Sequence, residues 1–131
     1  MTAHRLLRAS FALFTFCFAA FAHAATPNDL AGDWSTGGDA GVVRLHPCAE
    51  NAGALCGTLV SSRNPSRLRH GGLGMVFLRN FLWDGETFRG VINSPDDGRT
   101  YRGIIRPGAR ELNFQGCLGP FCQTEIWRRV G

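Results

Sequence analysis

Hydrophobic and polar residues alternate along most of the chain after its first 24 residues, in short runs separated by turn-forming residues. A period of two is typical of β-strands that bury one face. It predicts eight strands, over residues 32–36, 42–46, 55–61, 75–83, 87–94, 99–105, 112–116 and 123–130. Because short connections join the strands and closure removes exposed edges, we predict an all-β, eight-stranded antiparallel up-and-down barrel. A two-sheet sandwich is the alternative.

The segment 87–105 carries the clearest hairpin signal. Two runs of β-forming residues flank Pro95-Asp96-Asp97-Gly98, a four-residue turn in which the glycine supplies a positive φ. This loop length predicts a register in which Gly90 faces Gly103 and Ile92 faces Tyr101. A slip of one residue would set Ile92 against a threonine and mix the two faces.

The segment 75–83 is apolar on both faces, so its alternation does not settle which face is buried. Asp84-Gly85 is a strong two-residue turn signal, and it would place Phe81 opposite Phe88 and Arg79 opposite Gly90. Arg79 would then point into the barrel, where the glycines leave space for its side chain. The alternative is a β-bulge that turns Arg79 outward.

The first 24 residues have the pattern of an export signal. A basic start is followed by an apolar run over 11–21 and by Ala22-His23-Ala24, a small-x-small cleavage site. We therefore expect a single domain over residues 25–131 that is periplasmic or secreted. Cys17 follows Phe16 rather than a small residue, which argues against a lipoprotein, and the apolar run is too short for stable membrane insertion.

The net charge of the whole chain is +4, but removing the signal leaves 12 arginines against 10 acidic residues. This near balance gives no support for a nucleic-acid partner. Arg63, Arg67, Arg69 and His70 gather in the irregular segment 62–74. They would form either an anion-attracting lip over a cavity or a solvated basic loop.

Four cysteines remain after removal of the signal: Cys48, Cys56, Cys117 and Cys122. An even number in a small exported domain indicates disulfides. Each local pair spans one tight turn, so we predict Cys48–Cys56 and Cys117–Cys122, with Cys48 opposite Cys56. A zinc site is the rival interpretation, but the spacing does not match the usual ligand pattern, and we expect no metal and no cofactor.

Several motifs in order resemble the domain-of-unknown-function family 2147. They are Gly32-x-Trp34, Leu55-Cys56-Gly57, Gly72-Leu73-Gly74, Gly90-x-Ile92, Pro95-x-x-Gly98-x-x-Tyr101, Leu112 through Gly116-Cys117, and Trp127-x-Arg129-Val130. The resemblance implies an exported bacterial domain with a lipocalin-like barrel and names no catalytic residue. Gly32-x-Trp34 also resembles the lipocalin signature, which implies packing of Trp34 near Arg128 or Arg129.

The residues offer little for catalysis. His46 and His70 are the histidines outside the signal, no Gly-x-Ser-x-Gly motif exists, and the cysteines are expected to be paired. We therefore expect no enzyme but a barrel that holds a small apolar or amphiphilic molecule in the cell envelope. The alternative is an interaction or structural module with a filled core. The candidate ligand-binding residues are Arg79, Phe77, Phe81, Trp83, Phe88 and Tyr101.

Overall fold

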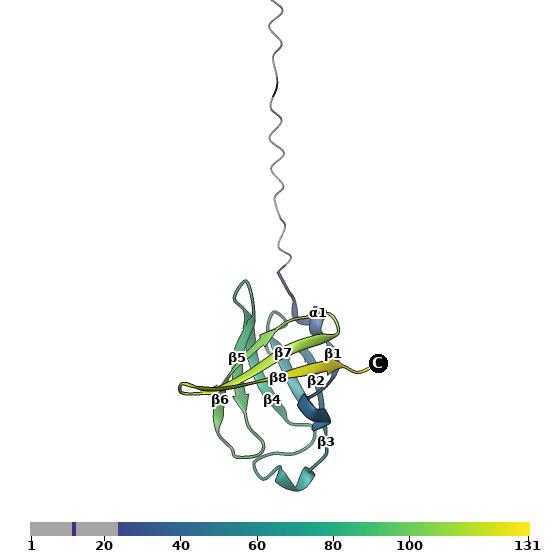
Figure 1. Cartoon of the computed structure of the whole chain (residues 1–131), viewed down its shortest axis with the longest axis vertical. Helices are drawn as coiled ribbons and strands as arrows, with labels where there is room; N and C mark the ends of the chain where they lie inside the picture. Colours follow the sequence, from purple (N-terminus) through teal and green to yellow (C-terminus); the bar gives the residue numbers. More distant parts are fainter. Residues whose placement is uncertain (1–11, 13–23) are drawn as a thin grey trace, which may run out of the picture.

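The chain folds into a closed antiparallel barrel whose strands follow one another in sequence order, as predicted (Figure 1). The computed structural model describes residues 12 and 24–131, so most of the expected export signal lies outside the described residues. The strands are β1 (Gly32–Ser35), β2 (Gly41–Pro47), β3 (Leu55–Ser62), β4 (Val76–Trp83), β5 (Phe88–Asn93), β6 (Thr100–Arg106), β7 (Glu111–Leu118) and β8 (Phe121–Arg129). Three short helical turns were not predicted: α1 (Pro27–Leu30), η1 (Gly37–Asp39) and η2 (Pro65–Arg67).

The helix α1 closes one end of the barrel (Figure 1). Thr26 and Asp29 form a capping box at its start, which satisfies backbone groups that a four-residue helix would otherwise leave free. Leu30 then enters the barrel and is 2% exposed, while its carbonyl accepts a hydrogen bond of 2.9 Å from Nε1 of Trp34. The opposite end carries η1, the segment with η2 and the β5–β6 turn, and Leu68 of that segment packs against the core there.

Arg129 supports the closed end and is the basic residue that packs against Trp34. Its guanidinium lies 4.4 Å from the centre of the Trp34 ring. The same group donates hydrogen bonds to the carbonyl oxygens of Asp29, Ala31 and Ala109. The Arg129 side chain therefore connects β8 to α1 and to the loop that precedes β7.

The predicted β5–β6 register is confirmed. Gly90 pairs with Gly103, Ile92 with Tyr101, and Gly98 has a φ of 72° as its turn requires. The space at the paired glycines does not hold Arg79, however. A Cβ added to Gly90 would lie 2.4 Å from the Phe81 ring, and one added to Gly103 would lie 2.3 Å from it.

The predicted β4–β5 register is wrong. Trp83 pairs with Phe88, so the turn holds four residues rather than Asp84-Gly85 alone, and Arg79 pairs with Val91 instead of Gly90. The Asp84 carboxylate closes this longer turn by accepting hydrogen bonds from the backbone N–H groups of Glu86 and Thr87 and from the Arg89 side chain. An aspartate that caps a wider turn thus overrides the two-residue signal.

Both predicted disulfides are present, Cys48–Cys56 and Cys117–Cys122. The second joins residues that face each other across β7 and β8. The predicted placement of Cys48 opposite Cys56 is wrong, because His46 pairs with Cys56 and Cys48 follows the end of β2. The bridge therefore closes the β2–β3 loop diagonally.

Replacing Asp84 with asparagine should lower stability at neutral pH. Hydrogen bonds from Thr87 and Glu86, and then from Arg89, hold the pKa of Asp84 well below its ordinary value. A depressed folded-state pKa gives stability that is present above the unfolded pKa of about 4 and is lost as pH falls through the folded value. The melting temperature difference between the wild type and Asp84→Asn should therefore be constant from pH 7 to about 5 and shrink below about 4. Asp96→Asn is the control, and an equal difference at pH 3 and pH 7 would contradict this role.

Candidate functional site

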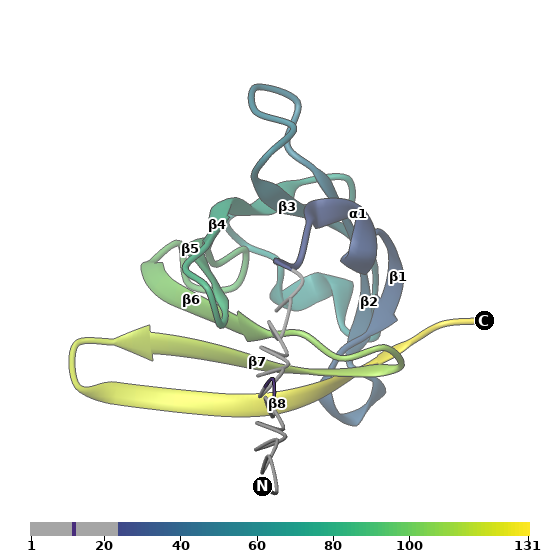
Figure 2. The ribbon, with the colours of Figure 1, turned by 90° about the horizontal axis from the view of Figure 1, so that it is seen from above.

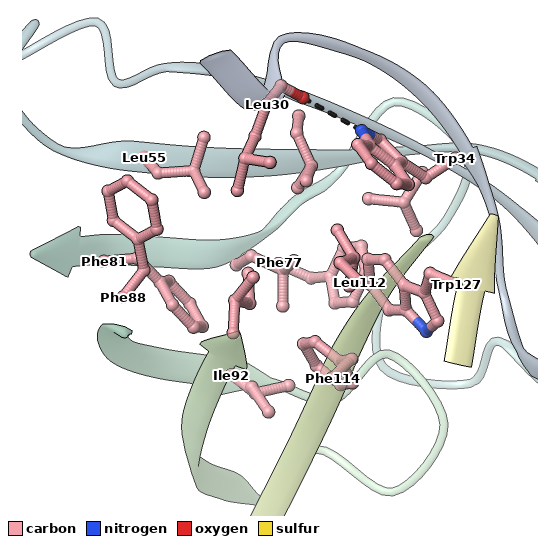
Figure 3. Close-up of a cluster of buried hydrophobic side chains, with 14 of the residues drawn as sticks. Leu30, Trp34, Leu55, Phe77, Phe81, Phe88, Ile92, Leu112, Phe114 and Trp127 are labelled. Atoms are coloured by element: carbon pink, nitrogen blue, oxygen red, sulfur yellow. Dashed lines mark hydrogen bonds between the residues drawn. The ribbon is translucent and has the colours of Figure 1, made fainter. Parts of the chain in front are cut away.

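The predicted ligand-binding residues divide between the two ends of the barrel. Phe81 and Phe88 are fully buried in the closed half, and Trp83 packs on Phe88 with ring centres 5.1 Å apart. Figure 3 shows Leu55, Phe81 and Phe88 at the left of the buried cluster, with Ile92 and Phe114 along its lower edge. Phe81 and Phe88 therefore fill the core, Trp83 packs against it, and none of the three lines a cavity described below.

Arg79 lies on the outside of the barrel, so the prediction that it points inward is wrong. The ladder between β4 and β5 is irregular from Arg79 to Leu82, and Asn80 within it has a φ of 53°. The strand therefore has the β-bulge that was the alternative interpretation of this segment. Arg79 and Asn80 are both exposed, and Phe81 is buried again. Arg79 instead lines a hollow of about 440 Å³ on the outer face, with His46, Glu50 and the Cys48–Cys56 bridge.

An apolar cup lies at the end of the barrel opposite α1 and has a volume of about 250 Å³. Phe77 is the member of the predicted set that lines it. Its wall was only partly predicted, since Phe77 comes from β4 but the other large apolar side chains come from five other strands and one loop. They are Val43, Leu59, Leu68, Ile92, Phe114 and Trp127.

Phe114 and Trp127 form the rigid part of the cup. Their rings are stacked with centres 4.2 Å apart and planes inclined by 17°. Nε1 of Trp127 donates a hydrogen bond of 2.5 Å to the Glu125 carboxylate, which fixes the indole from its polar edge. The Glu125 side chain in turn lies against Gly37, since a Cβ added there would be 2.7 Å from Oε2. Side-chain alternation places Glu125 and Trp127 on the same face of β8.

The charged residues that line the cup, among those the structure describes, are both acidic: Asp96 and Glu125. A more polar hollow of about 380 Å³ shares these two residues, Ser94 and Phe114 with the cup and continues it along β8. Tyr101 lines this extension and donates a hydrogen bond to Asp97. That bond lowers the pKa of Asp97 and raises the pKa of Tyr101.

The basic segment 62–74 reaches the cup through an apolar residue. Leu68 packs against the core and lines the cavity, whereas Arg63, Arg67, Arg69 and His70 are exposed. The segment is anchored to β3 because Leu59 donates to the Met75 carbonyl and accepts from Gly74. The arginines therefore lie beside the opening rather than in its wall.

Comparison with known proteins identifies the family. The sequence profile of domain-of-unknown-function family 2147, described as "Uncharacterized protein conserved in bacteria", matches residues 32–129. The chain belongs to this family. No curated protein and no solved structure gives a significant match.

One feature bears on where this family member is found. Its two disulfides indicate an oxidising, extracytoplasmic location. In the described part of the chain, no helix has the length and apolar character needed to cross a membrane.

Proposed function

We propose that this family member is an exported, non-catalytic binding protein of the cell envelope whose cup holds a small, mainly apolar molecule. The cup itself carries the proposal, because it is a concave apolar site at the end of the barrel opposite α1. Ligand pockets are typically apolar with a few polar groups, at about 300–1,000 Å³. A cup of about 250 Å³ therefore suits a small ligand or one apolar end of an amphiphile.

The lining favours a neutral or cationic polar group on that ligand. Asp96 and Glu125 face the cup and its extension, and neither is among the ion pairs formed within the described residues. An anionic group would be repelled by both carboxylates, whereas an amine would gain a charge-assisted hydrogen bond. Because Arg79 lies outside, it does not supply the inward cation that an acidic ligand would need.

Export by the 24-residue signal and location in the periplasm or outside the cell belong to the same proposal. They rest on the pattern of the first 24 residues and on the two disulfides. The interaction-module alternative keeps one observation of its own, the filled closed half around Phe81 and Phe88.

Ala40→Phe should block binding in the cup and leave the fold intact. Ala40 is exposed at the rim, lines the cup and has ordinary helical backbone angles, so a larger side chain can be accepted without strain. The probes are the neutral dye N-phenyl-1-naphthylamine, dodecylamine and dodecanoic acid, each followed by tryptophan fluorescence. We expect dodecylamine to bind more tightly than dodecanoic acid and Ala40→Phe to weaken dye binding about tenfold or more, the effect of about 1.4 kcal/mol of lost contact.

Ala49→Phe is the matched control. Ala49 is also exposed but lines the outer hollow beside Arg79. Dye binding that is lost in Ala49→Phe and kept in Ala40→Phe would place the site on the outer face and contradict the proposal.

A further inference from the structure

The barrel has an incomplete seam between its first and last strands. β8 pairs with β7 along eight residues, from Phe121 to Arg128, but it pairs with β1 only at Arg128 and Arg129. β1 ends at Ser35, and the chain then turns into η1. The β7–β8 hairpin consequently extends past the rest of the barrel (Figure 2), and its outer edge forms no strand pairing over residues 121–127. The turn η1 lies beside this edge at Glu125, where a Cβ added to Gly37 would be 2.9 Å from Cβ of Glu125.

One hydrogen bond shows which residues of β8 point their backbone N–H and C=O groups toward the seam. The Val130 N–H donates to the Asp33 carbonyl on β1, so even-numbered residues of β8 point their backbone groups toward the seam. Thr124 and Ile126 share this phase, and no backbone hydrogen bond links either of them to β1 or to η1 in the part of the chain that the structure describes. Both residues are exposed.

The edge has few of the features that discourage strand addition. Proteins protect free edges with charged side chains, proline, bulges or short strands. Residues 121–127 contain no basic residue, no proline and no bulge, and Glu125 is their one charged residue. The Cys117–Cys122 disulfide staples the hairpin beside its tip. A preorganised edge loses less entropy when it binds an additional strand.

The seam opens directly onto the cup. Thr36, Ala40 and Gly41 line the cup from one side of the seam, and Glu125 and Trp127 line it from the other. A strand that paired with the β8 edge would project alternate side chains to the two faces of the sheet. Side chains of one set would therefore enter the cup or its extension along β8.

We propose that an extended polypeptide segment docks as an added strand on the β8 edge between Phe121 and Thr124, as far as η1, and places an apolar side chain in the cup. A basic residue two positions away from that side chain meets Asp96 and Glu125, the carboxylates that line the cup and its extension. Main-chain hydrogen bonds supply affinity and alternate side-chain pockets supply selectivity, as in other cases of strand addition. The placement of a side chain in the cup rests on the proposed function, whereas the strand pairing along β8 is independent of it.

Thr124→Pro tests the edge, with Thr124→Val as its matched control. Proline removes the N–H that points to the seam, and edge strands accept proline where that group is unpaired. Valine changes the same side chain and keeps the N–H. The probe is a fluorescent hexapeptide with alternating valine and threonine between terminal arginines. Thr124→Pro should weaken its binding about tenfold or more, while Thr124→Val and wild type bind alike.

Two N-methylated forms of the peptide give a test on the wild-type protein that is independent of any folding defect. One form is methylated at the odd-numbered backbone nitrogens of the peptide and the other at the even-numbered ones. Both keep the same side chains, but each has lost the N–H donors along one edge of the peptide strand. We expect one phase to abolish binding and the other to retain it. Equal binding by both phases, or full binding to a folded Thr124→Pro, would overturn the proposal.

N-phenyl-1-naphthylamine separates this proposal from the proposed function. Thr124→Pro should bind the dye as wild type does, because the cup is unchanged. Loss of the dye site with retention of phase-dependent peptide binding would contradict the small-molecule function and support the edge. A wild-type dimer that Thr124→Pro converts to monomers would assign the edge to a second copy of the chain and overturn the peptide proposal.

Discussion

Phe81→Ala should destabilise the protein by about 3–5 kcal/mol, the range for deleting a buried phenylalanine from a close-packed core. Phe81 is fully buried, and its ring lies on the paired glycines of β5 and β6. The substitution would leave a cavity that backbone on both strands surrounds, so the site has little room to collapse. Chemical unfolding followed by tryptophan fluorescence measures the loss, and Phe77→Ala, at the cup, is the comparison.

Substitution of Gly103 tests whether the absence of a side chain there is needed to accommodate the Phe81 ring. Gly103→Ala should cost about 1–3 kcal/mol, because the added methyl would lie 2.3 Å from Cζ of Phe81 and force the core apart. In the Phe81→Ala background the same methyl enters the new cavity, so the double variant should be no less stable than Phe81→Ala alone. Additive losses would contradict the packing described for this part of the barrel.

Arg129→Met should cost about 2–4 kcal/mol, which combines charged hydrogen bonds with a cation–π contact. Its guanidinium bonds three carbonyl groups and covers Trp34, and these contacts connect β8 with α1 and β1. Arg129→Lys should recover little of the loss, since an ammonium cannot reproduce a planar fork.

Arg128→Met is the neighbouring control for Arg129. Arg128 is exposed and forms an ion pair of 3.2 Å with Glu111 on the outer face. Such surface pairs contribute about 0–1 kcal/mol. Equal losses for Arg128→Met and Arg129→Met in thermal or chemical unfolding would contradict the role assigned to Arg129.

Local sequence signals predicted strand pairing correctly where the turn residues were compatible with a single register. The Pro95–Gly98 turn predicted the β5–β6 pairing because a slip would have set Ile92 against Thr100, and each disulfide was predicted because its cysteines flank one turn. The resemblance to the lipocalin signature correctly anticipated a basic residue from the last strand on Trp34, leaving Arg128 or Arg129 open.

The position of Arg79 could not be predicted because β4 is apolar on both faces. Its register with β3 shifts between Leu78 and Val76, and its register with β5 shifts again around Asn80, so side-chain alternation fails twice along one strand. Phe77, Phe81 and Trp83 keep the inward positions expected of them, while Arg79 does not. Alternation alone carries no signal for such bulges.

The cup was foreseen only in outline because it is assembled from distant residues. Phe114 and Trp127 stack across β7 and β8, Leu68 comes from an irregular loop, and the seam depends on how few residues β1 pairs with β8. A short first strand, Gly32–Ser35, followed by Gly37-Gly38 was the available sign that the last strand would outrun its neighbour.

Methyl NMR of the protein titrated with N-phenyl-1-naphthylamine tests the cup most directly as the ligand site. Leu59 and Ile92 line the cup, whereas Leu30, Leu55 and Ile105 are buried toward the closed end. We predict shift changes and dye contacts at the methyl groups of Leu59 and Ile92, with those of Leu30 and Leu55 unchanged. Saturable dye contacts at Val76, on the outer hollow beside Arg79, without contacts at Leu59 and Ile92 would contradict the assignment of the site to the cup.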